Sequence, residues 1–339
     1  MSDKISVGPD HWSYGIHCSF QNAYDRLRDS NFLIKPMPVV AFLVLDAPEI
    51  DAYCKKFDDA YTIMLNSALF DSVNRIFRTI LAHPSTFLSI GRYQAETSPS
   101  TANKITFDQF VNDIPKFADR TPLDKTRIEF ADHLTELTMR FVIEHELAHI
   151  VAGHLDFDPK LTKILEVAND SDLTEPQNYG LEMHADELAF FCCLYWIFDS
   201  VDGTERILPK KIFIETLDAQ IHDLYTATYA LFQMFSHLSM STTHPNPLHR
   251  QIRLGIMLDW FCNEKKIELI NKPYELVGQV IFTFDEYMQS VFGIDWSDRQ
   301  QEAKHILGNA MNDEIKPYSE MVTAMYPALR PHAYINLEG

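Results

Sequence analysis

The first part of the chain alternates short apolar runs with turn-prone residues. The segments PVVAFLVLD (38–46) and AYTIMLN (60–66) are rich in apolar and β-branched residues, and the PEID sequence between them favours a turn. Both segments therefore predict β-strands. In the segment 67–83 apolar residues recur at helical spacing, and Ser67 is suited to cap its start. This region predicts a unit of strand, strand and helix.

A longer 3.6-residue rhythm of apolar positions follows and predicts a core helix. The rhythm runs from Phe130 to Ala152. Thr121, with Pro122 at the first helical position, marks the expected start, and Gly153 marks the expected end. The last turns of this helix carry several polar residues among the apolar ones.

More helices are predicted in the second half of the chain. One amphipathic helix covers 217–238, and another starts at Asn246, which can cap it ahead of a proline in the first turn. The apolar segment LAFFCCLYWIF (188–198) predicts a helix that is buried on all sides. Apolar stripes at helical spacing continue beyond residue 262.

These patterns predict an α+β fold that is mostly helical. We expect an N-terminal segment (1–37), a core (38–262) with a small N-terminal β-sheet, and a helical C-terminal extension (263–339) packed on that core. Residues 84–121 are polar and turn-rich, apart from a short helix around FDQFVNDI, and they predict an insertion in the core.

The charge and cysteine content narrow the class of protein. Lys and Arg total 29 against 48 for Asp and Glu, so the formal charge of −19 disfavours binding to nucleic acid or to an anionic membrane surface. The start of the chain does not resemble a signal peptide, and the most apolar run is well short of the roughly 20 residues needed to cross a bilayer. The five cysteines form no paired framework, which fits a reducing compartment. We therefore expect a cytoplasmic protein without membrane insertion.

The segment FVIEHELAHIVAGH (141–154) contains the pattern H-E-x-x-H. His145 and His149 are four residues apart, so they share one face of the predicted helix and can bind one Zn²⁺ ion together. A catalytic zinc site needs three protein ligands and one open position for water. Glu146 is set aside from the ligand pair and is suited to act as a general base on that water.

A third ligand is predicted from the segment LEMHADELAF (181–190). Glu182 and Asp186 are four residues apart on one face of a helix. If Glu182 binds zinc, Asp186 can accept the other N–H group of a ligating histidine, and the two roles could also be exchanged. His184, two residues from Glu182, points elsewhere on the helix and is not expected to join the site.

His154 is not expected to be the third ligand. In a continuous helix it would lie on the opposite side from His145, because nine residues correspond to about 900° of rotation. The spacing also differs from H-E-x-x-H-x-x-G-x-x-H, since Ala152 and Leu155 occupy the positions of the glycine and the last histidine. We therefore interpret His154 as a structural residue.

In three motifs the sequence resembles the gluzincin metallopeptidases of the CAAX prenyl endopeptidase and HtpX type. HELAHIVAGH is similar to their H-E-x-x-H-x-x-x-x-H helix, EMHAD (182–186) to their E-x-x-A-D segment, and THPNPLHRQI (243–252) to their T-H-P motif with its following Arg and Ile. The resemblance covers residues 38–83 and 122 to about 262.

The resemblance implies a zincin-like core and assigns roles to individual residues. His145, His149 and Glu182 would be the ligands of one zinc ion, and Glu146 the catalytic base. The family's T-H-P histidine corresponds to His244, which could stabilise an oxyanion. The resemblance also implies that Asp186 supports a ligating histidine and that Arg250, at the position of the family's Arg, lies near the active site.

The sequence also departs from the family. Residues 51–53 read Asp-Ala-Tyr where the family has N-A-F, the insertion at 84–121 is unexpected, and no transmembrane helices accompany the core. The chain resembles the Lit phage-exclusion peptidases more weakly, through H-E-x-x-H and general character. These departures leave the substrate open.

The expected function is that of a zinc-dependent endopeptidase acting on a protein or peptide. We expect the strand at 60–66 to border the active-site cleft and to pair with an extended substrate. The alternatives are a non-proteolytic zinc-binding interaction protein, a latent protease held shut by residues 84–121, and a hydrolase of a non-peptide bond. An intact Glu146 argues against the first of these, since a structural zinc site needs no base.

Overall fold

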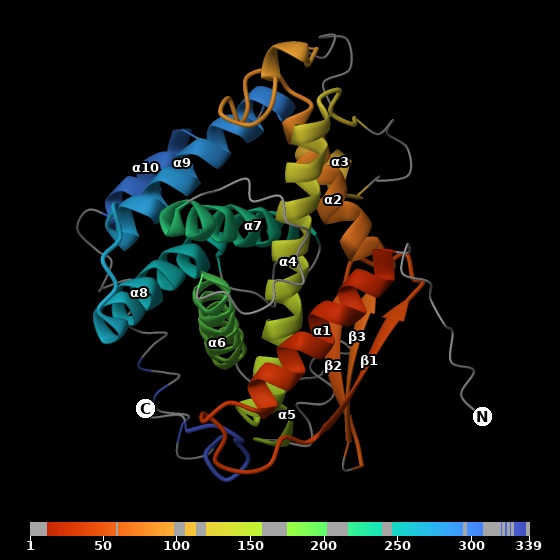
Figure 1. Ribbon diagram of the computed structural model, residues 1–339, viewed down its shortest axis with the longest axis vertical. Coiled ribbons are helices and arrows are strands. Elements are labelled where there is room, and N and C mark those ends of the chain that lie inside the picture. The colour runs from red at the N-terminus through yellow and green to blue at the C-terminus, as the bar shows by residue number, and fades with distance from the viewer. Residues whose placement is uncertain are drawn as a thin grey trace.

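The computed structural model describes residues 12–58, 60–97, 106–112, 120–157, 175–201, 216–238, 246–293, 297–307, 320, 323, 326 and 329–336. These residues form a mostly helical protein with one small sheet (Figure 1). This agrees with the predicted α+β, mostly helical class. The elements in chain order are α1 (Trp12–Arg28), β1 (Val39–Leu45), β2 (Ala52–Phe57), β3 (Ala60–Asn66), α2 (Ser67–Leu81), a 3₁₀ turn (Tyr93–Ala95), α3 (Phe107–Asn112), α4 (Lys125–Val151), α5 (His154–Phe157), α6 (Glu175–Val201), α7 (Leu217–His237), α8 (Pro247–Lys265), α9 (Pro273–Phe292) and α10 (Ser297–His305).

The sheet has the strand order β1-β3-β2. β1 runs parallel to β3, whereas β2 pairs with β3 in the antiparallel direction. The strands at 38–46 and 60–66 were predicted, but β2 was not. The prediction that the strand at 60–66 offers a free edge is wrong, because β3 is the central strand and both of its sides are paired. Among the described residues β1 and β2 each pair with β3 alone, so these two are the edge strands, and of the two β2 is the one that contacts α4.

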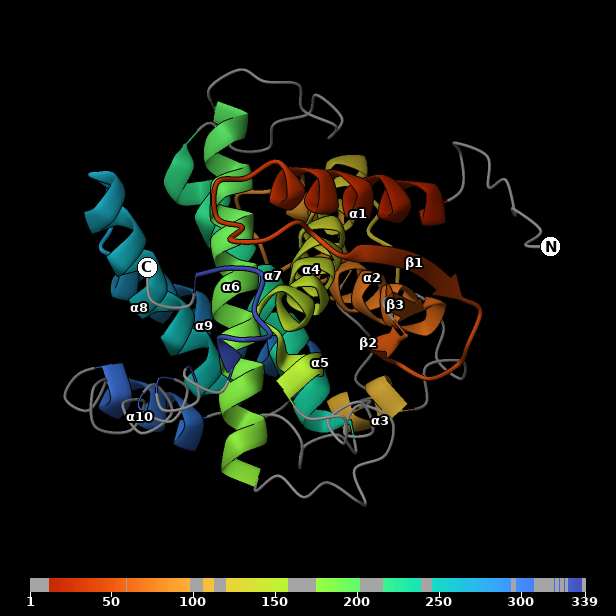
Figure 2. The same ribbon diagram turned by 90° about the horizontal axis from the view of Figure 1, so that it is seen from below.

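One face of the sheet packs against the helices. The buried side chains of Cys54, Ile63 and Leu65 share this face, and α4 contacts both β2 and β3. On β1, Phe42 stacks on Phe20 of α1 with their ring centroids 4.6 Å apart. Figure 2 shows α1 lying alongside β1. The sheet therefore holds β2 beside the middle of the molecule, next to α4.

Helix α4 runs through the centre of the molecule and contacts α1, α2, α6 and α7 (Figure 1). The prediction placed its start at Thr121, but Asp124 is the N-cap, and its carboxylate accepts hydrogen bonds from the backbone N–H groups of Thr126 and Arg127. An aspartate cap directly before the helix satisfies two backbone donors that would otherwise be unpaired. The helix ends at Val151, just before Gly153, as the sequence indicated.

Helices α6 to α9 complete the packing around α4. Helix α7 and the Asn246 cap of α8 agree with the prediction, and the Asn246 side chain accepts a hydrogen bond from Leu248 N–H at 2.8 Å. The segment 188–198 is part of α6, but it is not buried on all sides. Phe191, Tyr195 and Trp196 are only partly buried, because α6 packs on α4 with one face.

The last described segment, 329–336, returns to the end of α4 (Figure 1, bottom). Tyr334 N–H donates a hydrogen bond to the carbonyl oxygen of Val151, and Tyr334 O accepts one from Ile34 N–H. Gly153 adopts a positive φ of 76°, and a Cβ atom built there would lie 2.6 Å from the carbonyl carbon of His332. The end of α4 is thus fixed by a segment that lies almost two hundred residues further along the chain.

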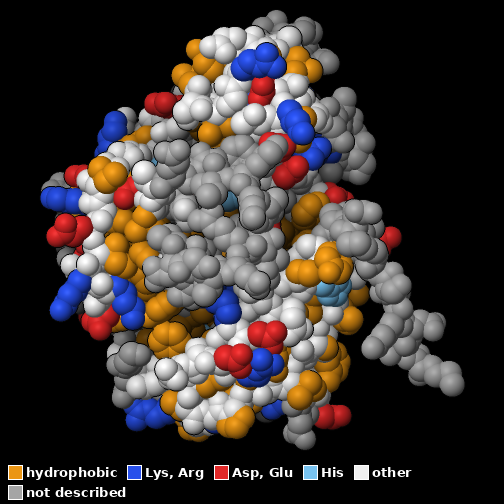
Figure 3. Space-filling model, viewed as in Figure 1, with side chains coloured by type: hydrophobic (Ala, Val, Ile, Leu, Met, Phe, Trp, Pro, Cys, Tyr) orange, Lys and Arg blue, Asp and Glu red, His pale blue; other side chains and the backbone are white. Residues whose placement is uncertain are grey.

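Two further expectations concern membrane insertion and the net negative charge. No described helix is long and apolar enough to cross a membrane. On the face displayed in Figure 3, the described Lys and Arg side chains are interspersed with Asp and Glu side chains. The net negative charge is therefore not collected in one patch on the described part of that face. The domain boundaries stay a prediction, although α9 packs on α7 and α8.

Candidate metal centre

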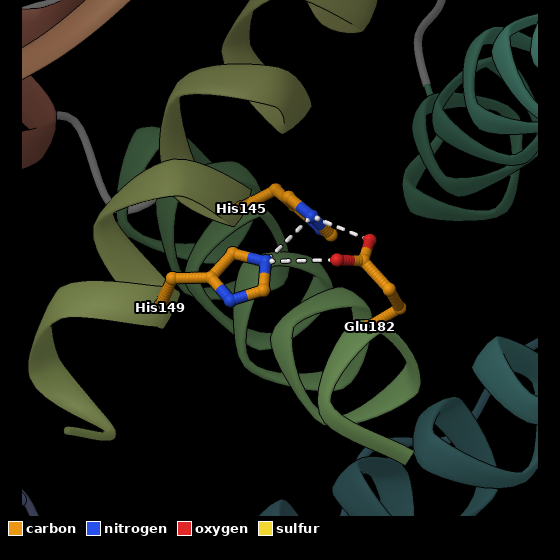
Figure 4. Close-up of side chains that lie close together, drawn as sticks. All are labelled: His145, His149 and Glu182. Carbon is orange, nitrogen blue, oxygen red and sulfur yellow. Dashed lines mark hydrogen bonds and ion pairs between the residues drawn. The ribbon is translucent and has the colours of Figure 1, made fainter. Parts of the chain in front are cut away.

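Two neighbouring helices bring three of the predicted residues together. His145 and His149 come from α4 and Glu182 from α6, and their side chains point toward one another (Figure 4). His145 Nε2 lies 3.1 Å from His149 Nε2 and 3.4 Å from Glu182 Oε2. The distance from His149 Nε2 to Glu182 Oε1 is 3.5 Å. The three side chains are largely buried, with 5 to 12% of their area exposed.

These separations fit the ligand shell of a zinc ion. Bond lengths of 2.0 to 2.1 Å in a tetrahedral site correspond to ligand atoms about 3.3 to 3.4 Å apart. The three measured distances, 3.1, 3.4 and 3.5 Å, bracket this value. Two imidazoles and one carboxylate are also the donors that catalytic zinc sites use, and they leave the fourth position open. His145, His149 and Glu182 could therefore hold one metal ion.

Asp186 supports this group from behind His145. Its Oδ1 atom lies 3.0 Å from His145 Nδ1, on the side of the ring away from Glu182. Arg250 of α8 donates two hydrogen bonds to the Asp186 carboxylate, at 2.6 and 2.7 Å, and its guanidinium lies 4.0 Å from the ring centre of Phe232. Of the two arrangements left open by the sequence, the structure favours the one in which Glu182 joins the histidines in the group that could hold a metal ion and Asp186 lies behind His145.

The charges of this group depend on burial and on its neighbours. Burial alone lowers the pKa of His145, but hydrogen bonds to Asp186 and Glu182 outweigh it and raise this pKa to about 10. Burial raises the pKa of Asp186, yet the positive charge of Arg250 lowers it below the usual value. Without a metal, the site thus favours a positive charge between two carboxylates. That position suits a cation.

Glu146 follows His145 on α4 and faces the sheet. Burial raises the pKa of its carboxyl group to about 8, and the neighbouring His145 acts in the opposite direction. The thiol of Cys54 on β2 forms a hydrogen bond with Glu146. Among the described residues, Glu146 Oε2 has no hydrogen-bond partner although it is buried. A carboxyl group with a pKa near neutrality and one free oxygen is suited to accept and release a proton.

His154 does not lie where the sequence analysis placed it. That analysis assumed a continuous helix, but α4 ends at Val151 and the turn at Gly153 redirects the chain. His154 Nδ1 therefore lies 2.9 Å from His149 Nδ1, and His154 Nε2 lies 3.0 Å from His184 Nδ1. Burial, and then the charges of His149 and His184, lowers the pKa of His154. Neither His154 nor His184 belongs to the metal-ligand group.

Two more residues bear on the site: His244, which the sequence predicted, and Cys54, which it did not. His244 lies outside the described residues, so its role stays a prediction. The contact of Cys54 with Glu146 was not expected. The short apolar stretch Ala52–Tyr53–Cys54 was the available sign of a strand, but the two lysines that follow it, Lys55 and Lys56, interrupt the apolar pattern.

Comparisons with known proteins give no relative. No family model matches the chain, and no curated protein or solved structure matches it either. The functional argument therefore depends on the geometry of the site.

Proposed function

We propose that the protein is a zinc-dependent endopeptidase of zincin-like architecture. The observation that carries this proposal is the convergence of His145, His149 and Glu182 at the spacing of a tetrahedral zinc shell, directly beside Glu146. A purely structural zinc site needs four protein ligands and no neighbouring base, so this set favours catalysis. The resemblance to gluzincins in three sequence motifs supports the same function.

Each residue has a distinct part in the proposed reaction. A zinc ion held by the three ligands would polarise a peptide carbonyl and increase the acidity of a water molecule. Glu146 accepts the proton of the attacking water through its free Oε2 atom and then donates a proton to the leaving amine. Asp186, held by Arg250, keeps His145 in the orientation that presents Nε2 to the metal.

A protein or peptide substrate is favoured by the position of β2. This strand contacts α4, and its Cys54 side chain reaches the catalytic glutamate. In the described sheet β2 is an edge strand, so an extended peptide could add beside it and place a carbonyl near Glu146. This corrects the expected substrate strand from β3 to β2 and keeps the expected class of substrate.

The test compares protein N-termini, by mass spectrometry, in cells that express the wild type or Glu146→Gln. The variant should retain zinc, because Glu146 is not a ligand, and should lose at least about 10²-fold in cleavage rate through loss of the base. New N-termini should therefore be found only with the wild type, and they would define the substrate and the cleavage preference.

The matched control is Glu129→Gln, which makes the same chemical change on α4, at a partly exposed residue paired with Lys125. It should produce the same new N-termini as the wild type. Equal sets of termini from the wild type and Glu146→Gln would contradict the proposed peptidase. Zinc content measured on the same proteins would then show whether a non-catalytic zinc protein remains as the explanation.

A further inference from the structure

Three buried histidines form a continuous chain that starts at the metal centre. His149 contacts His154 through their Nδ1 atoms at 2.9 Å, and His154 Nε2 contacts His184 Nδ1 at 3.0 Å. The exposed fractions of the three residues are 4, 2 and 3%. A sequence of three imidazoles in direct contact, at this burial, requires a definite arrangement of hydrogen atoms, because each neutral ring has one donor and one acceptor.

The metal position sets the direction of this chain. His149 presents Nε2 to His145 and Glu182, so a metal bound there would use the Nε2 lone pair. A neutral His149 must then carry its hydrogen on Nδ1 and donate it to His154 Nδ1. His154 in turn carries its hydrogen on Nε2 and donates it to His184 Nδ1. With the opposite direction, His149 would carry a hydrogen on Nε2 and could not bind metal.

The contact between His149 and His154 depends on the turn at Gly153. If α4 continued as a regular helix, the five residues from His149 to His154 would rotate the second side chain about 140° away from the first. The positive φ of Gly153 turns the chain and brings His154 back against His149. On the outer side, the ring of Tyr326 lies 5.5 Å from the ring of His184. The chain of histidines is thus enclosed at both ends.

We propose that His154 is a positioning residue of the metal centre, which accepts the Nδ1 hydrogen of His149 and, with His184 behind it, keeps His149 Nε2 directed at the metal. Its part for His149 corresponds to that of Asp186 for His145, except that a neutral ring replaces the carboxylate. The inference rests on the proposed zinc site. Partners of this kind hold ligating histidines in one tautomer and raise metal affinity.

The experiment measures zinc affinity, with no need for a substrate. The dissociation constant of zinc is determined by competition with a fluorescent chelator for the wild type, His154→Leu and His154→Asn. Leucine fills a similar space but accepts no hydrogen bond, so His154→Leu should weaken zinc binding roughly 10- to 100-fold. The Oδ1 atom of asparagine can accept the hydrogen in place of the imidazole Nδ1, so His154→Asn should recover most of that loss.

His133→Leu is the matched control. It replaces another histidine of α4, one that pairs with Asp223 away from the metal centre, and should leave zinc affinity unchanged. Equal zinc affinity in the wild type and His154→Leu would overturn the inference, and so would equal losses in the leucine and asparagine variants. If His154→Leu does not fold, a loss of roughly tenfold or more in His154→Asn would overturn it. Absence of zinc binding by the wild type would instead contradict the proposed function, and this inference with it.

Discussion

Two buried aspartates illustrate how neighbouring residues set the charge of a side chain in this protein. Asp186 accepts two hydrogen bonds from Arg250, which favour the ionised carboxylate behind the candidate metal centre. Asp285 of α9 is equally buried, but the hydrogen bond it receives comes from the neutral Tyr229 hydroxyl at 3.2 Å. Burial therefore raises the pKa of Asp285 to about 6.

The raised pKa of Asp285 predicts a pH-dependent stability. Because the folded-state pKa lies above the unfolded value of about 3.9, the folded protein binds the proton more tightly. This stabilisation is complete below about pH 4 and is lost as the pH rises through about 6, a change of about 3 kcal/mol. Asp285→Asn should lack the loss, so its free energy of unfolding should rise relative to the wild type between pH 4 and 7. Urea unfolding at several pH values measures this, and a constant difference would contradict it.

At the scale of elements, α4 is anchored at both ends by segments that lie far from it in the sequence. Near its start, Arg127 is fully buried and donates hydrogen bonds to backbone carbonyl oxygens at the end of α2 and in the loop that follows it. The acceptors are the carbonyl groups of Leu81, His83, Thr86, Phe87 and Ile90. At the other end, the segment 329–336 packs against Gly153.

Arg127→Met should destabilise the protein strongly. The change leaves several buried carbonyl groups without donors, and each costs about 1 to 3 kcal/mol, so the free energy of unfolding should fall by at least about 3 kcal/mol. Hydrogen exchange should increase in residues 82–97. As a control, Arg78→Met removes a partly exposed pair with Asp132 and should cost at most about 1 kcal/mol. Similar losses in the two variants would refute the anchoring role of Arg127.

Gly153→Ala tests the other end of the helix. A Cβ atom there would lie 2.6 Å from the carbonyl carbon of His332, at a φ of 76° that alanine rarely adopts. We expect a loss of more than about 1 kcal/mol in the free energy of unfolding. Gly15→Ala makes the same change in α1, where nothing lies within 4 Å, and should be neutral or stabilising. A thermal melt of both variants measures this, and a tolerated Gly153→Ala would count against the packing described for 329–336.

At the scale of the whole molecule, periodicity predicted elements better than it predicted their contacts. The apolar rhythm located α2, α4, α7 and α8 to within a few residues. It did not show that the C-terminal half of α4 and most of α7 are buried on every side. The order of strands could not be obtained in this way, since it depends on which edges meet in space. β2 was missed for a local reason, its two adjacent lysines.

The residues of the candidate site were also easier to predict than the contacts among them. The spacing of His145, Glu146 and His149 on one helix, and of Glu182 and Asp186 on another, was sufficient to select the residues that converge. The contact of His154 with His149 was not predictable from helical rotation, because a single turn at Gly153 cancels that rotation. The contact of Cys54 with Glu146 could be predicted only with the order of the strands, which places β2 beside α4.

The measurement that tests the central claim most directly is zinc K-edge X-ray absorption on the purified, metal-loaded protein, with the zinc content determined in parallel. The account predicts one zinc ion per chain, bound by two imidazole nitrogens and by oxygen atoms at about 2.0 to 2.2 Å, with no sulfur ligand. His149→Ala should lose this signal. A sulfur ligand at about 2.3 Å, a third imidazole, or no bound zinc at all would contradict the centre formed by His145, His149 and Glu182.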